Sequence, residues 1–110
     1  MNRKTIFLLL LVLNAVYVYS QHFDNENNFR WSRSGNSIKI IEYIGQNTDV
    51  RIPPQIRGLP VTEIGNGAFH ARGLVNVSIP DNVVTIGDWA FSANQQNCVR
   101  RKLHWRVTVV

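Results

Sequence analysis

Cysteine is almost absent from this sequence, in which Cys98 is the single thiol among 110 residues. One thiol excludes an internal disulfide, and a structural zinc site needs a cluster of ligands around it. Charged residues are also few, at 17%, whereas apolar residues reach 45%, a balance typical of a folded domain rather than a disordered one. The fold must therefore depend on apolar packing, unless Cys98 pairs with another chain.

Long apolar runs are scarce too, and the clearest one lies close to the N-terminus. Two positive charges, Arg3 and Lys4, precede the unbroken apolar run Ile6–Leu13. This pattern predicts a secretory signal peptide over residues 1–20, cleaved before Gln21. The run is shorter than the ~20 residues that span a bilayer, so we expect no transmembrane segment in the mature chain. The mature chain is expected to be secreted or displayed at the cell surface.

Positive charge is in excess only at the two ends of the chain. The net charge is +5, but residues 21–97 carry six basic and seven acidic side chains, a net charge of −1. Four basic residues fall in the tail 95–110, namely Arg100, Arg101, Lys102 and Arg106. So few charges give only weak, salt-sensitive attraction to nucleic acid, which is therefore not an expected partner.

An internal repeat is the most informative feature of the sequence. Residues 61–71 (VTEIGNGAFHA) recur 22 residues later as residues 83–93 (VVTIGDWAFSA), and six of the eleven positions are identical. Residues 49–53 (DVRIP) match residues 76–80 (NVSIP) at a spacing of 27, because a longer link, Pro54–Pro60, follows the first copy. Units of this length cannot bury their own apolar faces, so the copies are expected to stack side by side.

The strands of each unit are predicted from the alternation of apolar and polar side chains. We expect strands over residues 37–43 (SIKIIEY) and 49–52, the latter stopped by proline. In the second unit Val77 and Ile79 should point into the stack while Ser78 points out. The alternative is an ordinary small β domain whose hairpins happen to look alike.

The turn part of each unit carries the identical residues. We expect Gly87 to turn the chain with a positive φ, and Ala90 to be small because neighbouring coils approach closely. Phe91 should stack on Phe69 of the preceding coil.

These segments carry a resemblance to a known family. The run "IPPQIRGLPVTEIGNGAF" followed by "LVNVSIPDNVVTIGDWAF" resembles the BspA-like, or Treponema pallidum type, leucine-rich repeats, whose unit is close to L-x-x-V-x-I-P-x-x-V-x-x-I-G-x-x-A-F. The resemblance implies a β-rich leucine-rich-repeat solenoid of α/β type, with short strands joined by turns or short helical segments. Such proteins occur mainly in host-associated bacteria and some protists, are secreted or surface-displayed, and several mediate adhesion.

The resemblance also divides the chain into parts. The repeat region would cover residues 38–94, with repeats at about 49–71 and 76–93 behind an N-terminal strand cap. A polar lead-in, residues 21–37, would precede it, and the divergent basic tail 95–110 would follow.

A binding module without catalysis is the function that this reading favours. The outward strand positions would line a concave face that contacts an extracellular or surface protein; they are Asp49, Arg51, Asn76 and Ser78. His22, His70 and His104 share no ligand spacing with an acid or with Cys98, so we expect no metal site, no cofactor and no catalytic residues.

The C-terminal end departs from the repeat pattern and leaves a second hypothesis open. A strand at residues 107–109 could align with residues 77–79, but it arrives about eight residues late. The last coil would then expose Ile86, Ala90 and Phe91 unless the tail covers them, and an open edge of this kind favours self-association. On this alternative the chain is a truncated, non-functional fragment of a longer repeat protein.

Overall fold

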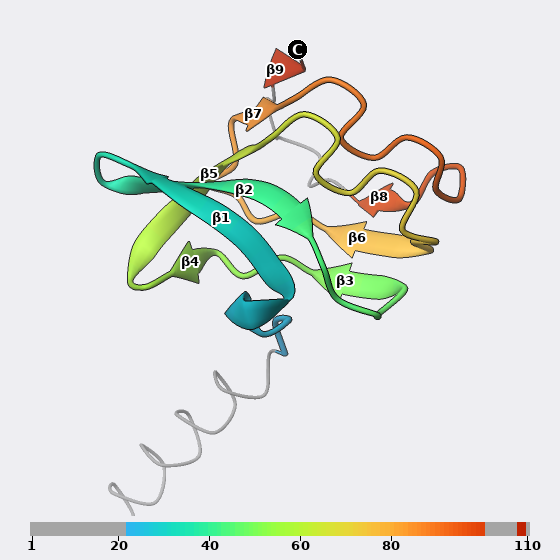
Figure 1. Ribbon diagram of the computed structural model, residues 1–110, viewed down its shortest axis with the longest axis horizontal. Helices are drawn as coiled ribbons and strands as arrows, with labels where there is room; N and C mark the ends of the chain where they lie inside the picture. Colours follow the sequence, from blue (N-terminus) through green and yellow to red (C-terminus); the bar gives the residue numbers. More distant parts are fainter. Residues whose placement is uncertain (1–21, 101–107, 110) are drawn as a thin grey trace, which may run out of the picture.

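The computed structural model describes residues 22–100 and 108–109, which form two β-sheets around an apolar core (Figure 1). The one helix in this part is a 3-10 turn, η1 (Glu26–Asn28), so the connections between the stacked strands are turns rather than short helices. The first sheet has the order β1 (Phe29–Ser34), β2 (Ser37–Tyr43), β5 (Leu59–Ile64), β7 (Thr85–Ile86) and β9 (Thr108–Val109), and β4 (Gln55–Ile56) pairs with β5. The second sheet contains β3 (Asp49–Arg51), β6 (Asn76–Ser78) and β8 (Val99–Arg100).

Residues that correspond in the sequence repeat lie opposite each other in the paired strands. Ile64 of β5 pairs with Ile86 of β7, 22 residues later, in a parallel ladder. Val50, Val77 and Val99 take the same place in β3, β6 and β8, which are also parallel. The predicted pairing of the segments around Val50 and Val77 is therefore confirmed, and Figure 1 shows these three strands one above another.

A β-hairpin explains why the first spacing is longer than the second. The link Pro54–Pro60 contains β4, which turns back to pair antiparallel with β5. Arg57 and Gly58 at the turn have φ values of 55° and 76°, as a tight two-residue hairpin connection requires. The additional residues thus form a hairpin, and β3 and β5 still pair in register with β6 and β7.

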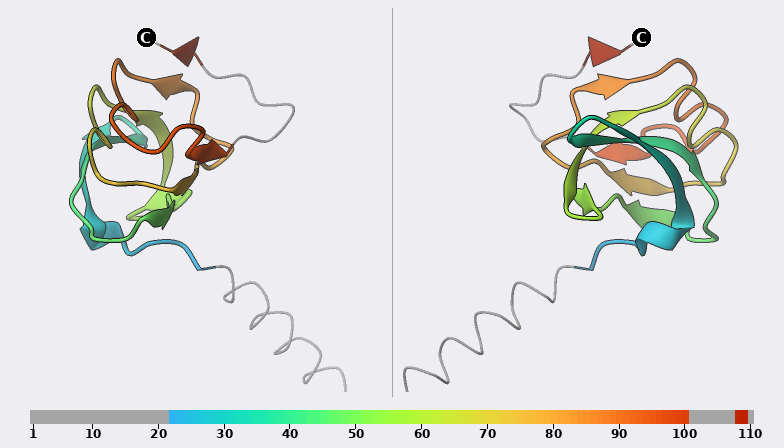
Figure 2. Two further views of the ribbon diagram at one scale, coloured as in Figure 1. Left: turned by 90° about the vertical axis from the view of Figure 1, so that its right-hand side faces the viewer. Right: turned by 60° about the vertical axis from the view of Figure 1, so that its left-hand side comes forward.

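The polar lead-in forms part of the fold, which the sequence did not predict. Strand β1 pairs antiparallel with β2 through a turn at Gly35, and the first sheet curls away from this hairpin (Figure 2). Asp24 covers the edge of the second sheet, because its N–H donates to the Arg51 carbonyl oxygen at 2.9 Å and its carboxylate accepts from the Arg51 N–H at 3.1 Å. The outer edge of the second sheet is therefore covered by Asp24, whereas β1 itself forms the edge of the first sheet.

The third strand of the second sheet is not the one that we expected. We aligned residues 107–109 with β6, but β8 pairs there, with Val99 and Arg100 beside Val77 and Ser78. Strand β9 pairs instead with β7 in the first sheet. The expectation was wrong because β8 lacks the second aliphatic residue and the proline that mark the two earlier strands.

Stacked aromatic rings run through the core across the units. The ring centroids of Phe69 and Phe91 are 5.1 Å apart with planes at 20°, which confirms the predicted contact. Tyr43 extends the column on the other side of Phe69, at 5.5 Å and 15°. Tyr43 and Phe69 are fully buried, whereas Phe91 at the end of the column is half-buried.

Gly87 is required for a different reason from the one expected. Positive φ occurs not at Gly87 but two residues later, at Trp89 (60°), as it does at Gly67 (64°) in the first copy. A Cβ on Gly87 would overlap Asn66 Oδ1 and would lie 2.6 Å from the Asn66 backbone nitrogen and 2.8 Å from the Gly65 carbonyl carbon. Glycine is needed here because the backbones of two successive turns approach too closely for any side chain.

Asn94 holds successive turns together through both ends of its amide. Its Oδ1 accepts from the N–H groups of Arg72 at 2.9 Å and Leu74 at 3.1 Å. Its Nδ2 donates to the carbonyl oxygens of Phe69 at 2.6 Å and Phe91 at 2.9 Å. One side chain thereby satisfies backbone groups that the irregular turns leave without partners.

Candidate functional site

The four residues predicted for a binding face lie together on the second sheet. Asp49 pairs in register with Asn76, and Arg51 with Ser78, so the four form two short rows across β3 and β6. Asp49 and Arg51 are exposed, Asn76 and Ser78 are partly exposed, and the valines between them are buried. Alternation along each strand thus turns all four polar side chains to the same side of the sheet.

Arg100 belongs to the same surface, and the sequence analysis missed it. It pairs with Ser78 across β6 and β8, and its Nε donates to Asn76 Oδ1 at 3.1 Å. The 22-residue spacing from Ser78 to Arg100 was the signal that could have found it. The candidate binding face is therefore Asp49, Arg51, Asn76, Ser78 and Arg100.

The charged groups of the first sheet differ from those of the candidate binding face. On its outward side Lys39 Nζ lies 3.0 Å from Glu63 Oε1, and Glu42 pairs with two arginines. None of the ion pairs within the described residues involves Arg51 or Arg100. Within this part of the chain the guanidinium groups of Arg51 and Arg100 are therefore not engaged in an ion pair with a carboxylate.

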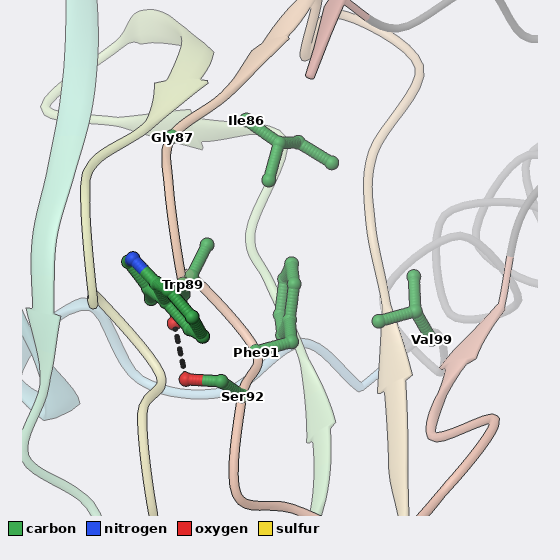
Figure 3. Close-up of a pocket in the computed structure, with 7 residues that line it drawn as sticks. Ile86, Gly87, Trp89, Phe91, Ser92 and Val99 are labelled. Carbon is green, nitrogen blue, oxygen red and sulfur yellow. Dashed lines mark hydrogen bonds between the residues drawn. The ribbon is translucent and has the colours of Figure 1, made fainter. Parts of the chain in front are cut away.

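An apolar pocket of about 370 Å³ opens beside the turn that follows β7, residues 87–93 (Figure 3). Ile86, Phe91 and Val99 contribute side chains to it, and Trp89 at its rim is 76% exposed. The sequence predicted that Ile86, Ala90 and Phe91 would be exposed here unless the tail covered them. In the structure Ile86 and Ala90 are only 5% and 3% exposed, and Phe91 is half-buried. The exposed apolar surface beside this turn is therefore narrower than the sequence suggested.

Cys98 lies near this pocket as a buried thiol. Burial raises its pKa above the ordinary value, the opposite of what a reactive thiol needs. Cys98 lies directly before β8 and is only 4% exposed, so it is a small buried residue in this structure.

His22 and His70, the two histidines within the described residues, do not belong to a metal-binding group. His70 Nδ1 lies 2.5 Å from Ser92 Oγ, both near the surface, and His22 is exposed. His104 lies outside the described residues. Among residues 22–100 and 108–109 no three histidine, cysteine, aspartate or glutamate side chains form a group that could hold a metal ion. In the same part of the chain no helix has the length and apolar character to cross a membrane.

Comparison with known proteins supports the fold. No protein-family model matches the chain, and no curated protein matches it. The crystal structure of a T. pallidum leucine-rich-repeat protein is similar, with a TM-score of 0.64 and 35% sequence identity over 66% of this chain. The chain has a β-rich, leucine-rich-repeat-like fold, and it spans about a third of the length of that neighbour, 35%.

Proposed function

We propose that this chain is a secreted leucine-rich-repeat binding module of the BspA-like type, which mediates adhesion by contacting an extracellular or surface protein. In this proposal residues 49–71 and 76–93 are two units of a solenoid, and β1 and β2 form its N-terminal cap. The in-register rows of polar side chains on the candidate binding face carry the proposal. Repeat proteins use extended sheet surfaces of this kind for recognition, and the leucine-rich-repeat-like fold favours binding over catalysis.

Reversing charge on the candidate binding face is expected to weaken binding. The variant carrying Arg51→Glu and Ser78→Glu should bind its protein partners at least about tenfold more weakly, because the lost charge-assisted contact of Arg51 contributes about 1.5–3 kcal/mol and the two new carboxylates repel an acidic group of a partner. The measurement is surface plasmon resonance of the purified chain against a panel of purified extracellular-matrix and cell-surface proteins. Arg33→Glu, which reverses an exposed charge on β1, is the matched control and should bind like the parent chain. Equal losses in both variants would remove the assignment of this face.

Secretion is proposed from residues 1–20, which lie outside the described residues. Expression of the full chain in a secreting bacterial host should release a product whose N-terminal residue is Gln21. Arg3→Glu with Lys4→Glu should reduce the released amount several-fold, because the positive region before the apolar run is needed for export. Edman sequencing and mass measurement of the medium check both results. A chain that stays in the cell with Met1 intact would contradict the signal peptide.

The alternative, a fragment without independent function, stays open as a second hypothesis. The apolar pocket beside Phe91 is the observation that favours it, because a complete array covers its last coil with a cap. It predicts broad, poorly cooperative unfolding and strong binding of hydrophobic dyes. A sharp two-state transition of the monomer would count against it.

A further inference from the structure

The two turns that follow β5 and β7 are joined by three backbone hydrogen bonds in which the first turn donates and the second accepts. The N–H groups of Gly67, Phe69 and Ala71 donate to the carbonyl oxygens of residues 88, 90 and 92, at 2.9, 2.7 and 2.9 Å. Every second residue of the first turn thus donates toward the C-terminal end of the stack. The second turn, residues 87–93, accepts all three bonds and covers the ring of Phe69 with that of Phe91.

The second turn presents the same donors at its own C-terminal side. By the 22-residue repeat, the N–H groups of Trp89, Phe91 and Ala93 correspond to the three donors of the first turn. Trp89 and Ala93 also share the positive φ of their counterparts, so the two turns have similar backbones. Within the described residues none of these three N–H groups has an acceptor. Donor groups and the apolar pocket therefore lie along one edge, which we call the donor edge (residues 87–99).

The N–H groups and the apolar pocket of the donor edge determine which kind of segment can bind there. A binding segment must place carbonyl oxygens at alternate residues against the three N–H groups and bring an apolar or aromatic group to Phe91. Two copies meeting through this edge would face N–H groups with N–H groups, an electrostatically unfavourable match. Head-to-tail stacking of copies is hindered as well at the second sheet, because Asp24 already bonds the outer edge of β3.

We propose that the donor edge binds a polypeptide segment of a partner protein, one that carries an aromatic side chain and offers a row of backbone carbonyl groups. This contact is separate from the candidate binding face, since it uses the end of the stack rather than the outward side of β3, β6 and β8. Binding by backbone addition places few demands on sequence apart from the aromatic residue.

A synthetic peptide of residues 61–72 (VTEIGNGAFHAR) is the probe, because this turn segment resembles the one that covers Phe69 and contains no tryptophan. Titrated into the full 110-residue chain, it should give a saturable change in tryptophan fluorescence through the exposed Trp89. The same peptide with alanine in place of Phe69 should bind at least tenfold more weakly. This comparison changes only the peptide, so it does not depend on how well a protein variant folds.

Two protein variants complete the test. Phe91→Ala in the full chain, with its fold checked by circular dichroism, should weaken peptide binding at least tenfold. The variant with Arg51→Glu and Ser78→Glu should bind the peptide like the parent chain, which separates this inference from the proposed function. No saturable fluorescence change, or equal binding of both peptides, overturns the proposal. So does a dimer in sedimentation velocity that Phe91→Ala abolishes, because it would assign the edge to a second copy.

Discussion

Replacing Phe69 by alanine is expected to lower the free energy of unfolding by about 4 kcal/mol, the range of buried phenylalanine truncations. Phe69 is fully buried at the centre of the aromatic column, with Tyr43 on one side and Phe91 on the other. The substitution removes two ring stacks together with the apolar contacts and leaves a cavity between two turns that cannot collapse easily. Chemical denaturation followed by circular dichroism measures the loss.

The matched control for this substitution is Phe23→Ala. Phe23 has the same side chain but is 48% exposed, so its loss should cost about 1 kcal/mol or less, as for surface substitutions generally. A small loss at Phe69, comparable with that at Phe23, would contradict the stacked arrangement of the units. The parent chain should unfold in one cooperative transition if the column joins the units into a single core.

Gly87→Ala is expected to destabilise the protein by about 3 kcal/mol, at the upper end of what overpacking of a core costs. The new Cβ would meet the backbone of Gly65 and Asn66, and neither can move aside without breaking the hydrogen bonds between the turns. The Gly87 N–H itself donates to the Ile64 carbonyl oxygen at 2.8 Å, so a shift of residue 87 would also disturb the pairing of β5 with β7. Thermal and urea unfolding of the variant give the difference.

Gly67→Ala separates this close approach from backbone conformation. Gly67 has a φ of 64° but open space around its missing Cβ, so alanine should cost only about 1–2 kcal/mol, the strain of a left-handed residue. Trp89 occupies the corresponding position in the second turn with a φ of 60°, which shows that a side chain fits there. If Gly67→Ala were the more damaging of the two, φ rather than the close approach would be the dominant constraint.

Several features of the fold could be predicted because the repeat places its identical residues at buried positions. Ile64 and Ile86, like Phe69 and Phe91, are separated by 22 residues and lie beside each other in the structure. The four predicted residues of the candidate binding face followed from strand alternation alone, and the structure brings them together. Whether they bind a partner stays a prediction.

The features that could not be predicted depend on contacts outside the repeat. Strand β1 has few apolar residues, and it is stabilised by pairing with β2 rather than by its own pattern. Asp24 reaches the backbone of Arg51 across 27 positions, which no local rule anticipates. Strand β8 was missed because its place is set by register with β6, whereas its side chains do not repeat the earlier motif. The steric need for glycine at position 87 could not be predicted either, because the sequence does not show how closely the two turns approach.

The hairpin of β4 and β5 has a consequence for how this molecule can be altered. Its Arg57–Gly58 turn contacts Glu26 of η1 through an ion pair of 3.2 Å and a long hydrogen bond of 3.4 Å from the Arg57 N–H. The Arg57 side chain is mostly exposed, so these contacts contribute little stability. Lengthening a loop costs free energy only slowly with the number of added residues. This tip can therefore accept a foreign peptide graft, an epitope or a labelling tag, at little thermodynamic penalty, while the two surfaces proposed for recognition remain as they are.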